Sequence, residues 1–211
     1  MESNLYFQII FPILLGYFFG CIQNSYFVGK YKFSVNVKEE GSKNAGASNS
    51  VMLFGFKYGF FVGLIDVFKA YVPMMIIFSM YSEYPQDQVL LLACVSGAGA
   101  IAGHMFPFFM KFDGGKGMAC YLGMLIGFDF SFGLIVCLIG AILLMITNYV
   151  AAATIIIVVC IPIFAHFFCG ATLSLVIAVS LLSCLIITKH TENIFKILNG
   201  TESTFWSVFK K

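Results

Sequence analysis

Long apolar runs alternate with short polar segments along this chain, and that alternation constrains its fold more than any other feature. Hydrophobic residues make up 60% of the 211 residues, charged residues make up 10%, and the mean hydropathy is +0.95. About 20 consecutive apolar residues cross a bilayer as a helix, and a soluble domain of this size does not carry so much apolar sequence. The sequence therefore predicts an all-α polytopic membrane protein with a single integral-membrane domain over residues 1–211.

We expect seven membrane helices, one of them short. Six apolar runs are long enough to span a bilayer, and they cover residues 5–29, 57–80, 88–110, 130–147, 150–168 and 171–188. The seventh run, residues 117–127, is roughly half of a full span. Since non-helical backbone within membranes is tolerated only where it lines a cavity or is buried in protein, we expect this segment to be tilted or half-inserted beside such a site.

Lysine is concentrated in alternate segments between the expected helices. Residues 30–50, 111–116 and 189–211 carry lysine, whereas residues 81–87 and 128–131 carry none. Cytoplasmic loops have an excess of basic residues, so seven spans with the N-terminus outside account for the alternation. The three lysine-bearing segments then share the cytoplasmic side, where we expect the active site. The net charge is only +2, and no nucleic-acid partner is expected.

The most unusual polar stretch is GHMFPFFMKFDGGKG, residues 103–117, which follows the third apolar run. Gly114 and Gly115 allow the backbone to approach a ligand closely. Lys116 supplies a positive charge, and Gly117 precedes an apolar run whose first helical N–H groups have no intrahelical partner. This combination favours binding of an anion, with phosphate the simplest choice.

Several familiar catalytic motifs are absent. In the Walker A motif, Met110 would stand at the first Gly and Gly117 at the Ser or Thr. A His-x4-Asp acyltransferase box starting at His104 fails, because Phe109 occupies the Asp position. The chain has no Gly-x-Ser-x-Gly elbow, and no cysteine neighbours an obvious base. A covalent acyl-enzyme is therefore not expected.

Asp66, Lys69 and His104 are ionisable residues that fall within apolar runs. Asp66 and Lys69 are three residues apart and therefore share one helical face. At ~1.5 Å per residue, Lys69 lies about 18 Å beyond Lys57, near the middle of the membrane. The pair is either functional or a self-neutralising structural pair. His104 is a phosphate donor, a base or a helix-end histidine bonded to a carbonyl.

The seven cysteines lie almost entirely within the apolar runs and show no paired metal-ligand spacing such as Cys-x-x-Cys. We interpret them as small buried apolar residues, and we expect no metal site. They are Cys21, Cys94, Cys120, Cys137, Cys160, Cys169 and Cys184.

Three ordered motifs resemble those of the PlsY-type acyl-phosphate:glycerol-3-phosphate acyltransferases of bacterial membranes. GSKNAGASN at residues 41–49 resembles G-S-G-N-x-G-A-T-N, and residues 103–117 contain G-H-x-F-P followed by F-x-G-G-K-G. HTENI at residues 190–194 is similar to H-R-E-N-I, and Asp66 with Lys69 matches a D-x-x-K in the second span. The resemblance covers nearly the whole chain.

The resemblance implies transfer of a fatty acyl group from acyl-phosphate to the 1-hydroxyl of glycerol 3-phosphate, which gives lysophosphatidic acid for phospholipid synthesis. It implies no acyl-CoA, acyl-carrier protein, metal or other cofactor. Catalysis in this family is thought to rely on positioning and on the substrate's own phosphate as base, in agreement with the missing covalent nucleophile. The implied location is the inner (plasma) membrane of a bacterium, with the lipid bilayer as partner.

The resemblance also implies the site residues. Ser42, His104, Lys116 and Asn193 match catalytic positions. The matched substrate-binding residues are Asn44, Ser48, Asn49, Gly114, Gly115, Gly117, His190 and Glu192.

Departures from the family pattern concentrate on the acceptor side. The chain has twelve lysines and no arginine, and Met52 and Thr191 stand where the family has Arg. Lys43 replaces a Gly, and Asn148 replaces the Arg of T-R-Y-V-S. A lysine lacks the bidentate fork of an arginine. Transfer to another alcohol or amine therefore stays open, as does a non-catalytic or transport role.

Overall fold

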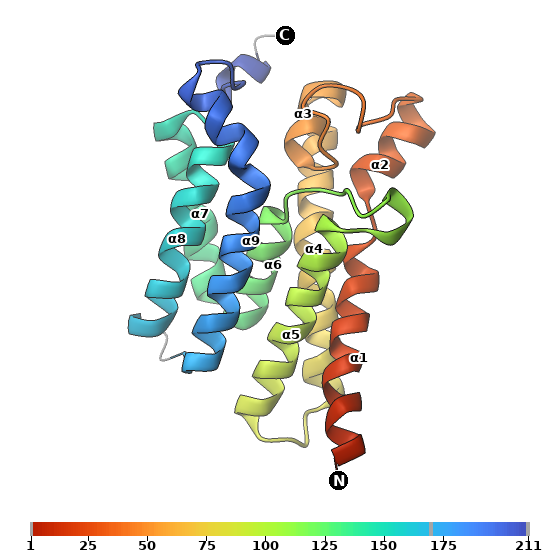
Figure 1. The fold of residues 1–211 in the computed structure, drawn as a ribbon, viewed down its shortest axis with the longest axis vertical. Helices are drawn as coiled ribbons and strands as arrows, with labels where there is room; N and C mark the ends of the chain where they lie inside the picture. Colours follow the sequence, from red (N-terminus) through yellow and green to blue (C-terminus); the bar gives the residue numbers. More distant parts are fainter. Residues whose placement is uncertain (1, 169–170, 210–211) are drawn as a thin grey trace. The chain divides into compact units, whose positions relative to one another are not determined.

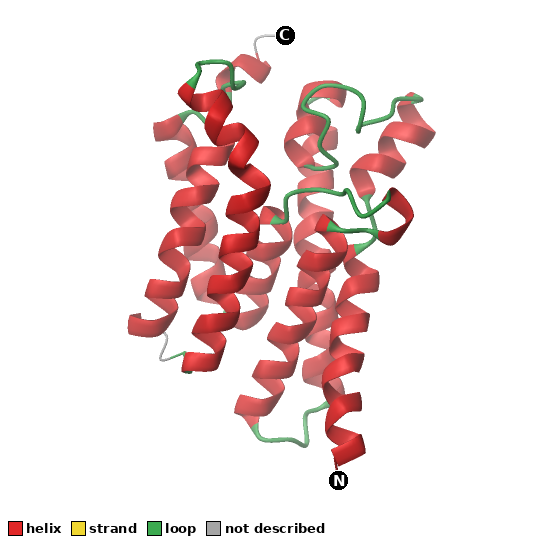
Figure 2. Ribbon diagram, in the orientation of Figure 1, coloured by secondary structure: helices red, strands yellow, loops and turns green. Residues whose placement is uncertain are grey.

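The computed structural model describes residues 2–168 and 171–209, and every regular element in this part of the chain is helical (Figure 1, Figure 2). Among the described residues, six helices are long and apolar enough to cross a membrane, and Met118–Phe128 is a further short apolar helix. The all-α membrane prediction, with one short helix, is confirmed. The chain divides after Leu134 into two compact units, which are described separately.

Most of the elements belong to the first unit. They are α1 (Glu2–Gly20), α2 (Asn24–Val28), a π-helical turn (Gly29–Phe33), α3 (Ala47–Phe54), α4 (Phe56–Met80), α5 (Gln86–Met105), a 3-10 turn (Phe108–Met110), α6 (Met118–Phe128) and the start of α7 (Phe130–Thr147). The second unit contains the rest of α7, α8 (Val150–Phe168), α9 (Leu173–Leu198) and a 3-10 turn (Trp206–Phe209).

The first apolar run is not the single continuous helix expected over residues 5–29. It breaks after Gly20, and the chain turns before α2 begins at Asn24. Gln23 lies buried in this break, where its Nε2 donates to the carbonyl oxygen of Gly20 at 3.4 Å and to that of His104 at 2.9 Å. The polar side chain thus satisfies carbonyl groups at the ends of two helices.

Three other boundaries also differ from expectation. Helix α5 ends at Met105 rather than at residue 110, because Pro107 disfavours helical backbone at the residue before it. Helix α9 continues beyond residue 188 to Leu198, where Lys196 and Glu192 pair one helical turn apart at 3.3 Å. Helix α3 lies partly within the segment expected to be polar loop.

Glycines allow α1 and α5 to pack closely, side by side (Figure 1). A Cβ built on Gly99 would overlap the carbonyl oxygen of Ile13, and one built on Gly103 would overlap that of Tyr17. Close approach of this kind supplies the van der Waals contact that holds membrane helices together. It also brings the end of α5, where His104 lies, against the end of α1.

The short helix α6 packs against α4 and α5 within the first unit. A Cβ on Gly123 would overlap the carbonyl oxygen of Val67 in α4, and Tyr121 and Met124 are buried. The short apolar run is therefore part of the packed interior of this unit.

The cysteine interpretation is only partly correct. Cys21, Cys94 and Cys120 are buried, whereas Cys160 and Cys184 are exposed. These two lie on α8 and α9, whose outward faces also carry large apolar side chains. Apolar outer faces are expected of helices that meet lipid rather than water. Cys169 lies outside the described residues.

We predict that Gly99→Ala lowers the stability of the protein in detergent by about 1–3 kcal/mol, because the new methyl group overlaps backbone rather than a movable side chain. Gly63→Ala on α4 is the matched control, since its Cβ would meet only the Cβ of Ala47 at 3.2 Å. Thermal unfolding of both variants checks this. Equal unfolding temperatures would contradict the close packing of α1 on α5.

Candidate functional site

Two polar loops of the first unit meet at one end of its helices. The loop before α3 contains the first motif, and the loop between α5 and α6 contains the second. Lys38 Nζ lies 2.8 Å from Asp113 Oδ2 and so joins the loops by an ion pair. A Cβ on Gly115 would lie 2.9 Å from the carbonyl oxygen of Ala45. The first two sequence motifs are therefore in contact.

Asn49 organises the first loop from within. Its side chain is buried on α3, and its Oδ1 accepts the N–H of Ser42 at 2.8 Å. Its Nδ2 donates to the carbonyl oxygens of Val37 at 2.9 Å and Glu40 at 3.1 Å. These bonds use both ends of the amide, so any contribution of Asn49 to substrate binding acts through the shape of the loop.

The other matched residues of this loop are more accessible. Ser42 and Ser48 are exposed, and Asn44 is partly exposed. Lys43 is also exposed and has a φ of 56°, in the left-handed region. Non-glycine residues adopt this region at a steric cost, which explains physically why a glycine suits this position in the family motif. Here the ammonium of Lys43 extends from a strained turn.

Gly114 and Gly115 of the second loop contact the end of α5 at His104. The N–H of Gly114 donates to the carbonyl oxygen of Met105 at 3.0 Å, and that of Gly115 donates to the carbonyl oxygen of His104 at 3.0 Å. A Cβ on Gly115 would overlap Nε2 of His104. The missing side chain lets the loop fold back over the imidazole.

The expected helix start after the glycine loop is present. Gly117 has a φ of 90° and directly precedes α6, whose first turn carries no side-chain cap. Lys116 is partly exposed immediately before it. The N–H groups of a first helical turn and an adjacent ammonium are a suitable environment for an anion.

His104 lies on the last turn of α5 and is 3% exposed. Its Nδ1 is 2.8 Å from Lys69 Nζ, which also lies 2.9 Å from Asp66 Oδ1 and 2.9 Å from the carbonyl oxygen of Ile22. The expected same-face pairing of Asp66 with Lys69 is confirmed. Nδ1 of His104 faces the ammonium of Lys69. A ring bonded to a carbonyl through this nitrogen, one of the expected alternatives, is therefore not observed.

The third motif belongs to the second unit. On α9, His190 is buried with its Nδ1 2.8 Å from the carbonyl oxygen of Ile186. Asn193 Nδ2 donates to Glu202 Oε1 at 2.6 Å, and Glu192 is exposed beside Lys196. These contacts lie within the second unit, and the loop contacts described above lie within the first.

Asn148, at the position of a family arginine, has a structural role in the second unit. It has a φ of 59° in the turn between α7 and α8. Its carbonyl oxygen accepts the N–H of Phe205 at 2.8 Å, and its Oδ1 accepts that of Trp206 at 3.1 Å. Asn148 therefore ties the segment after α9 to the α7–α8 turn.

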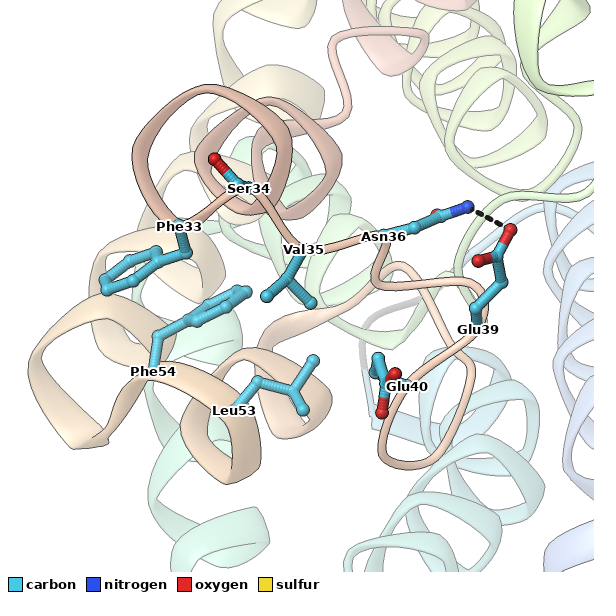
Figure 3. Close-up of a pocket in the computed structure, with 8 residues that line it drawn as sticks. All are labelled: Phe33, Ser34, Val35, Asn36, Glu39, Glu40, Leu53 and Phe54. Carbon is cyan, nitrogen blue, oxygen red and sulfur yellow. Dashed lines mark hydrogen bonds between the residues drawn. The ribbon is translucent and has the colours of Figure 1, made fainter.

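A cavity of about 480 Å³ lies beside the first loop (Figure 3). Phe33 and Phe54 stack at 4.4 Å between ring centroids on one side, while Glu39 and Glu40 contribute carboxylates. Asn36 Nδ2 donates to Glu39 Oε1 at 2.6 Å, as Figure 3 shows. With two carboxylates and no lysine in its lining, this cavity does not suit an anionic phosphate.

The sequence reasoning missed two polar contacts behind the loops. Gln23 supports the His104 carbonyl, and Tyr17 donates its hydroxyl to the carbonyl oxygen of Phe106 at 2.9 Å. The polar run Gln23-Asn24-Ser25 inside an apolar stretch was the available signal for the first. The second had no signal, because a tyrosine in a membrane helix is common near interfaces.

Replacing Asn49 with Ala should open the first loop. We expect faster hydrogen exchange at the Ser42 amide and a stability loss of about 1–3 kcal/mol, because three hydrogen bonds lose their partner in a buried position. Mass spectrometry of exchange over residues 37–42 measures it. Ser48→Ala, at the exposed neighbouring position, is the control. Similar exchange in the two variants would refute the role of Asn49.

The chain is similar to known membrane acyltransferases along nearly its whole length. A sequence model of the family described as Glycerol-3-phosphate acyltransferase matches residues 10–200. The chain is 38% identical to Glycerol-3-phosphate acyltransferase 1 of Oceanobacillus iheyensis over 203 residues, which cover 94% of this chain and 95% of that protein. It is 33% identical to the Glycerol-3-phosphate acyltransferase of Thermotoga petrophila over 193 residues, covering 92% and 94% of the two chains.

Solved structures agree with these relatives. The crystal structure of PlsY (YgiH), an integral membrane glycerol 3-phosphate acyltransferase, in its glycerol 3-phosphate form has a TM-score of 0.84 and 29% identity, with 93% of this chain and 95% of that chain covered. The lysophosphatidic acid form has a TM-score of 0.79 and 27% identity, with 96% and 99% covered. This chain belongs to the glycerol-3-phosphate acyltransferase family of integral membrane proteins.

Proposed function

We propose that this protein acylates the 1-hydroxyl of glycerol 3-phosphate to give lysophosphatidic acid, with an acyl-phosphate as the donor. The observation that carries the proposal is the contact between the first and second motif loops, which gathers Lys116, the first turn of α6 and the exposed polar side chains of residues 42–48 at one end of the first unit. Both substrates carry phosphate, which matches this cationic and donor-rich surface. Family membership supports the acceptor.

The chemistry requires no covalent intermediate. The 1-hydroxyl oxygen attacks the acyl carbonyl carbon, the carbon–oxygen bond to phosphate breaks, and inorganic phosphate departs with that electron pair. The hydroxyl proton passes to a phosphate oxygen. Lys116 and the N–H groups of α6 stabilise the negative charge on the departing phosphate. The rate gain comes from holding two substrates in the attacking geometry.

The remaining matched residues position the substrates in this proposal. Ser42, Asn44 and Ser48 offer hydroxyl and amide groups to the acceptor, and Asn49 maintains their loop. His190, Glu192 and Asn193 on α9 match substrate-orienting positions of the family motif, and this match is the basis of their assigned role. This division gives the glycine loop the donor phosphate and the first loop the acceptor.

We place the site on the cytoplasmic face of a bacterial inner membrane. In the first unit, the start of α1 and the turn between α4 and α5 lie at one end, and the loops before α3 lie at the other (Figure 1). The former turn carries Glu83 but no lysine, whereas the loop end carries Lys38, Lys43 and Lys116. The excess of basic residues on the cytoplasmic side supports this orientation.

A different acceptor is the second candidate function. The chain contains no arginine, and the cavity beside the first loop presents Glu39 and Glu40. Carboxylates attract a cationic amine and repel glycerol 3-phosphate. If acyl-phosphate is consumed and a screen of alcohols and amines yields a product only with an amine, this candidate replaces the first.

The central test is acyl transfer by purified protein given palmitoyl phosphate and glycerol 3-phosphate. We expect lysophosphatidic acid by mass spectrometry, and a kcat roughly 100-fold lower or more for Lys116→Ala, because one stabilising donor to the leaving phosphate is lost. Lys111→Ala removes an exposed lysine from the same loop and is the matched control. Wild-type protein that forms no lysophosphatidic acid, or equal rates in both variants, would overturn the assignment.

Lys43 provides a separate test of the acceptor side. Lys43→Gly should raise the KM for glycerol 3-phosphate several-fold, roughly the effect of one exposed charge contact, while it raises stability by about 1 kcal/mol through relief of the left-handed backbone at 56°. Steady-state kinetics and thermal unfolding measure the two effects. A lower KM in the variant would show that Lys43 opposes acceptor binding.

A further inference from the structure

The buried ammonium of Lys69 determines which nitrogen of His104 carries the proton. Lys69 Nζ has three donor hydrogens and no lone pair when charged. Three acceptor positions surround it, namely Asp66 Oδ1 at 2.9 Å, the carbonyl oxygen of Ile22 at 2.9 Å and His104 Nδ1 at 2.8 Å. The ammonium is therefore fully used if Nδ1 accepts.

The opposite arrangement is disfavoured by the same distances. A proton on Nδ1 would place an N–H against an ammonium at 2.8 Å, with two donors facing each other. The other acceptor on that side, Asp66 Oδ1, is 3.8 Å from Nδ1, beyond hydrogen-bond length. Asp66 Oδ1, 2.9 Å from Lys69 Nζ, supplies a counter-charge for the ammonium within the same buried site.

We propose that the Asp66–Lys69 pair holds His104 as the neutral tautomer protonated at Nε2. The imidazole then presents a hydrogen-bond donor on the side where Gly115 packs, because a Cβ on Gly115 would overlap Nε2. His104 is consequently a donor and not the general base of the reaction. Lys69 is a positioning residue that acts through His104, a role in catalysis that rests on the proposed acyl transfer.

This assignment distinguishes two mechanisms. If His104 accepted the hydroxyl proton, its Nε2 would have to be unprotonated before the reaction. If Nε2 stays protonated, the hydroxyl proton passes to a phosphate oxygen of the substrates. The Nε2–H of His104 then donates to the turn at Gly115 or to an oxygen of the bound phosphate. Histidine tautomers set by a partner at the other ring nitrogen are a general device of protein sites.

Nitrogen NMR of protein labelled with ¹⁵N-histidine tests the tautomer directly. His104→Gln assigns the His104 signals among the three histidines of the chain. We expect Nδ1 of His104 to give the unprotonated signal and Nε2 the protonated one, with couplings to the ring protons identifying each nitrogen. A protonated Nδ1, in either a neutral or a charged ring, would overturn the inference.

A double variant that removes both Asp66 and Lys69 tests whether this pair sets the His104 tautomer. Asp66→Leu/Lys69→Met leaves no unpaired buried charge, and so avoids the penalty of breaking the pair on one side. We expect this variant to populate both His104 tautomers, and its kcat to fall roughly tenfold or more. Lys57→Met makes the same lysine change at an exposed position of α4 and should leave the His104 signals and the kcat unchanged.

The two readouts separate the two proposals. An unchanged Nε2–H signal in the folded double variant would show that the pair does not set the tautomer. Wild-type protein with the expected tautomer but no acyl transfer would leave the tautomer assignment standing and overturn the proposed function instead. Folding of each variant is checked from its helix content and thermal unfolding.

Discussion

A charged amine buried in a membrane protein needs a counter-ion and a full set of acceptors, and Lys69 obtains them from three segments. Desolvation of an unpaired charge costs several kcal/mol, so the ammonium stabilises only an arrangement in which all acceptors are present. These are Asp66 on its own helix, Ile22 after α1 and His104 at the end of α5. One ammonium thereby fixes where α1 and α5 end beside α4.

The backbone carbonyl of His104 connects the buried Lys69 cluster to the motif loops. Its carbonyl oxygen accepts the N–H of Gly115 at 3.0 Å and the Nε2 of Gln23 at 2.9 Å. The glycine loop is thus tied to the end of α5 and pressed against the first loop near Ala45. In the proposed transfer, two phosphate-bearing substrates have to be held in the attacking geometry, and contact between the loops would serve that purpose. His104 therefore contacts both the buried Lys69 in the interior and Gly115 in the glycine loop.

Hydropathy and helical spacing predicted the membrane helices and the Asp66–Lys69 pair, because both follow from periodicity along one segment. The contact between Lys69 and His104 joins different helices, and no local pattern encodes it. The break after Gly20 was not predicted because the polar run Gln23-Asn24-Ser25 is short and apolar residues flank it on both sides. Helix α9 was cut short at residue 188 for the converse reason, since a polar extension of a helix resembles a loop in composition. The packing of Gly115 against the His104 ring likewise joins separate segments, and the glycine-rich pattern alone does not predict it.

The chain has no arginine, so the phosphate site that we propose depends on lysine and on backbone N–H groups. Arginine recognises phosphate through a planar fork that specifies orientation, whereas a lysine supplies charge without direction. A site built from lysines must therefore obtain its directionality from fixed N–H groups and from loops that cannot rotate. The left-handed turn at Gly117 before α6, and the bonds that Asn49 makes to the first loop, provide such fixed geometry. In the site that we propose, the internal contacts that hold the loops would take the orienting role of an arginine fork.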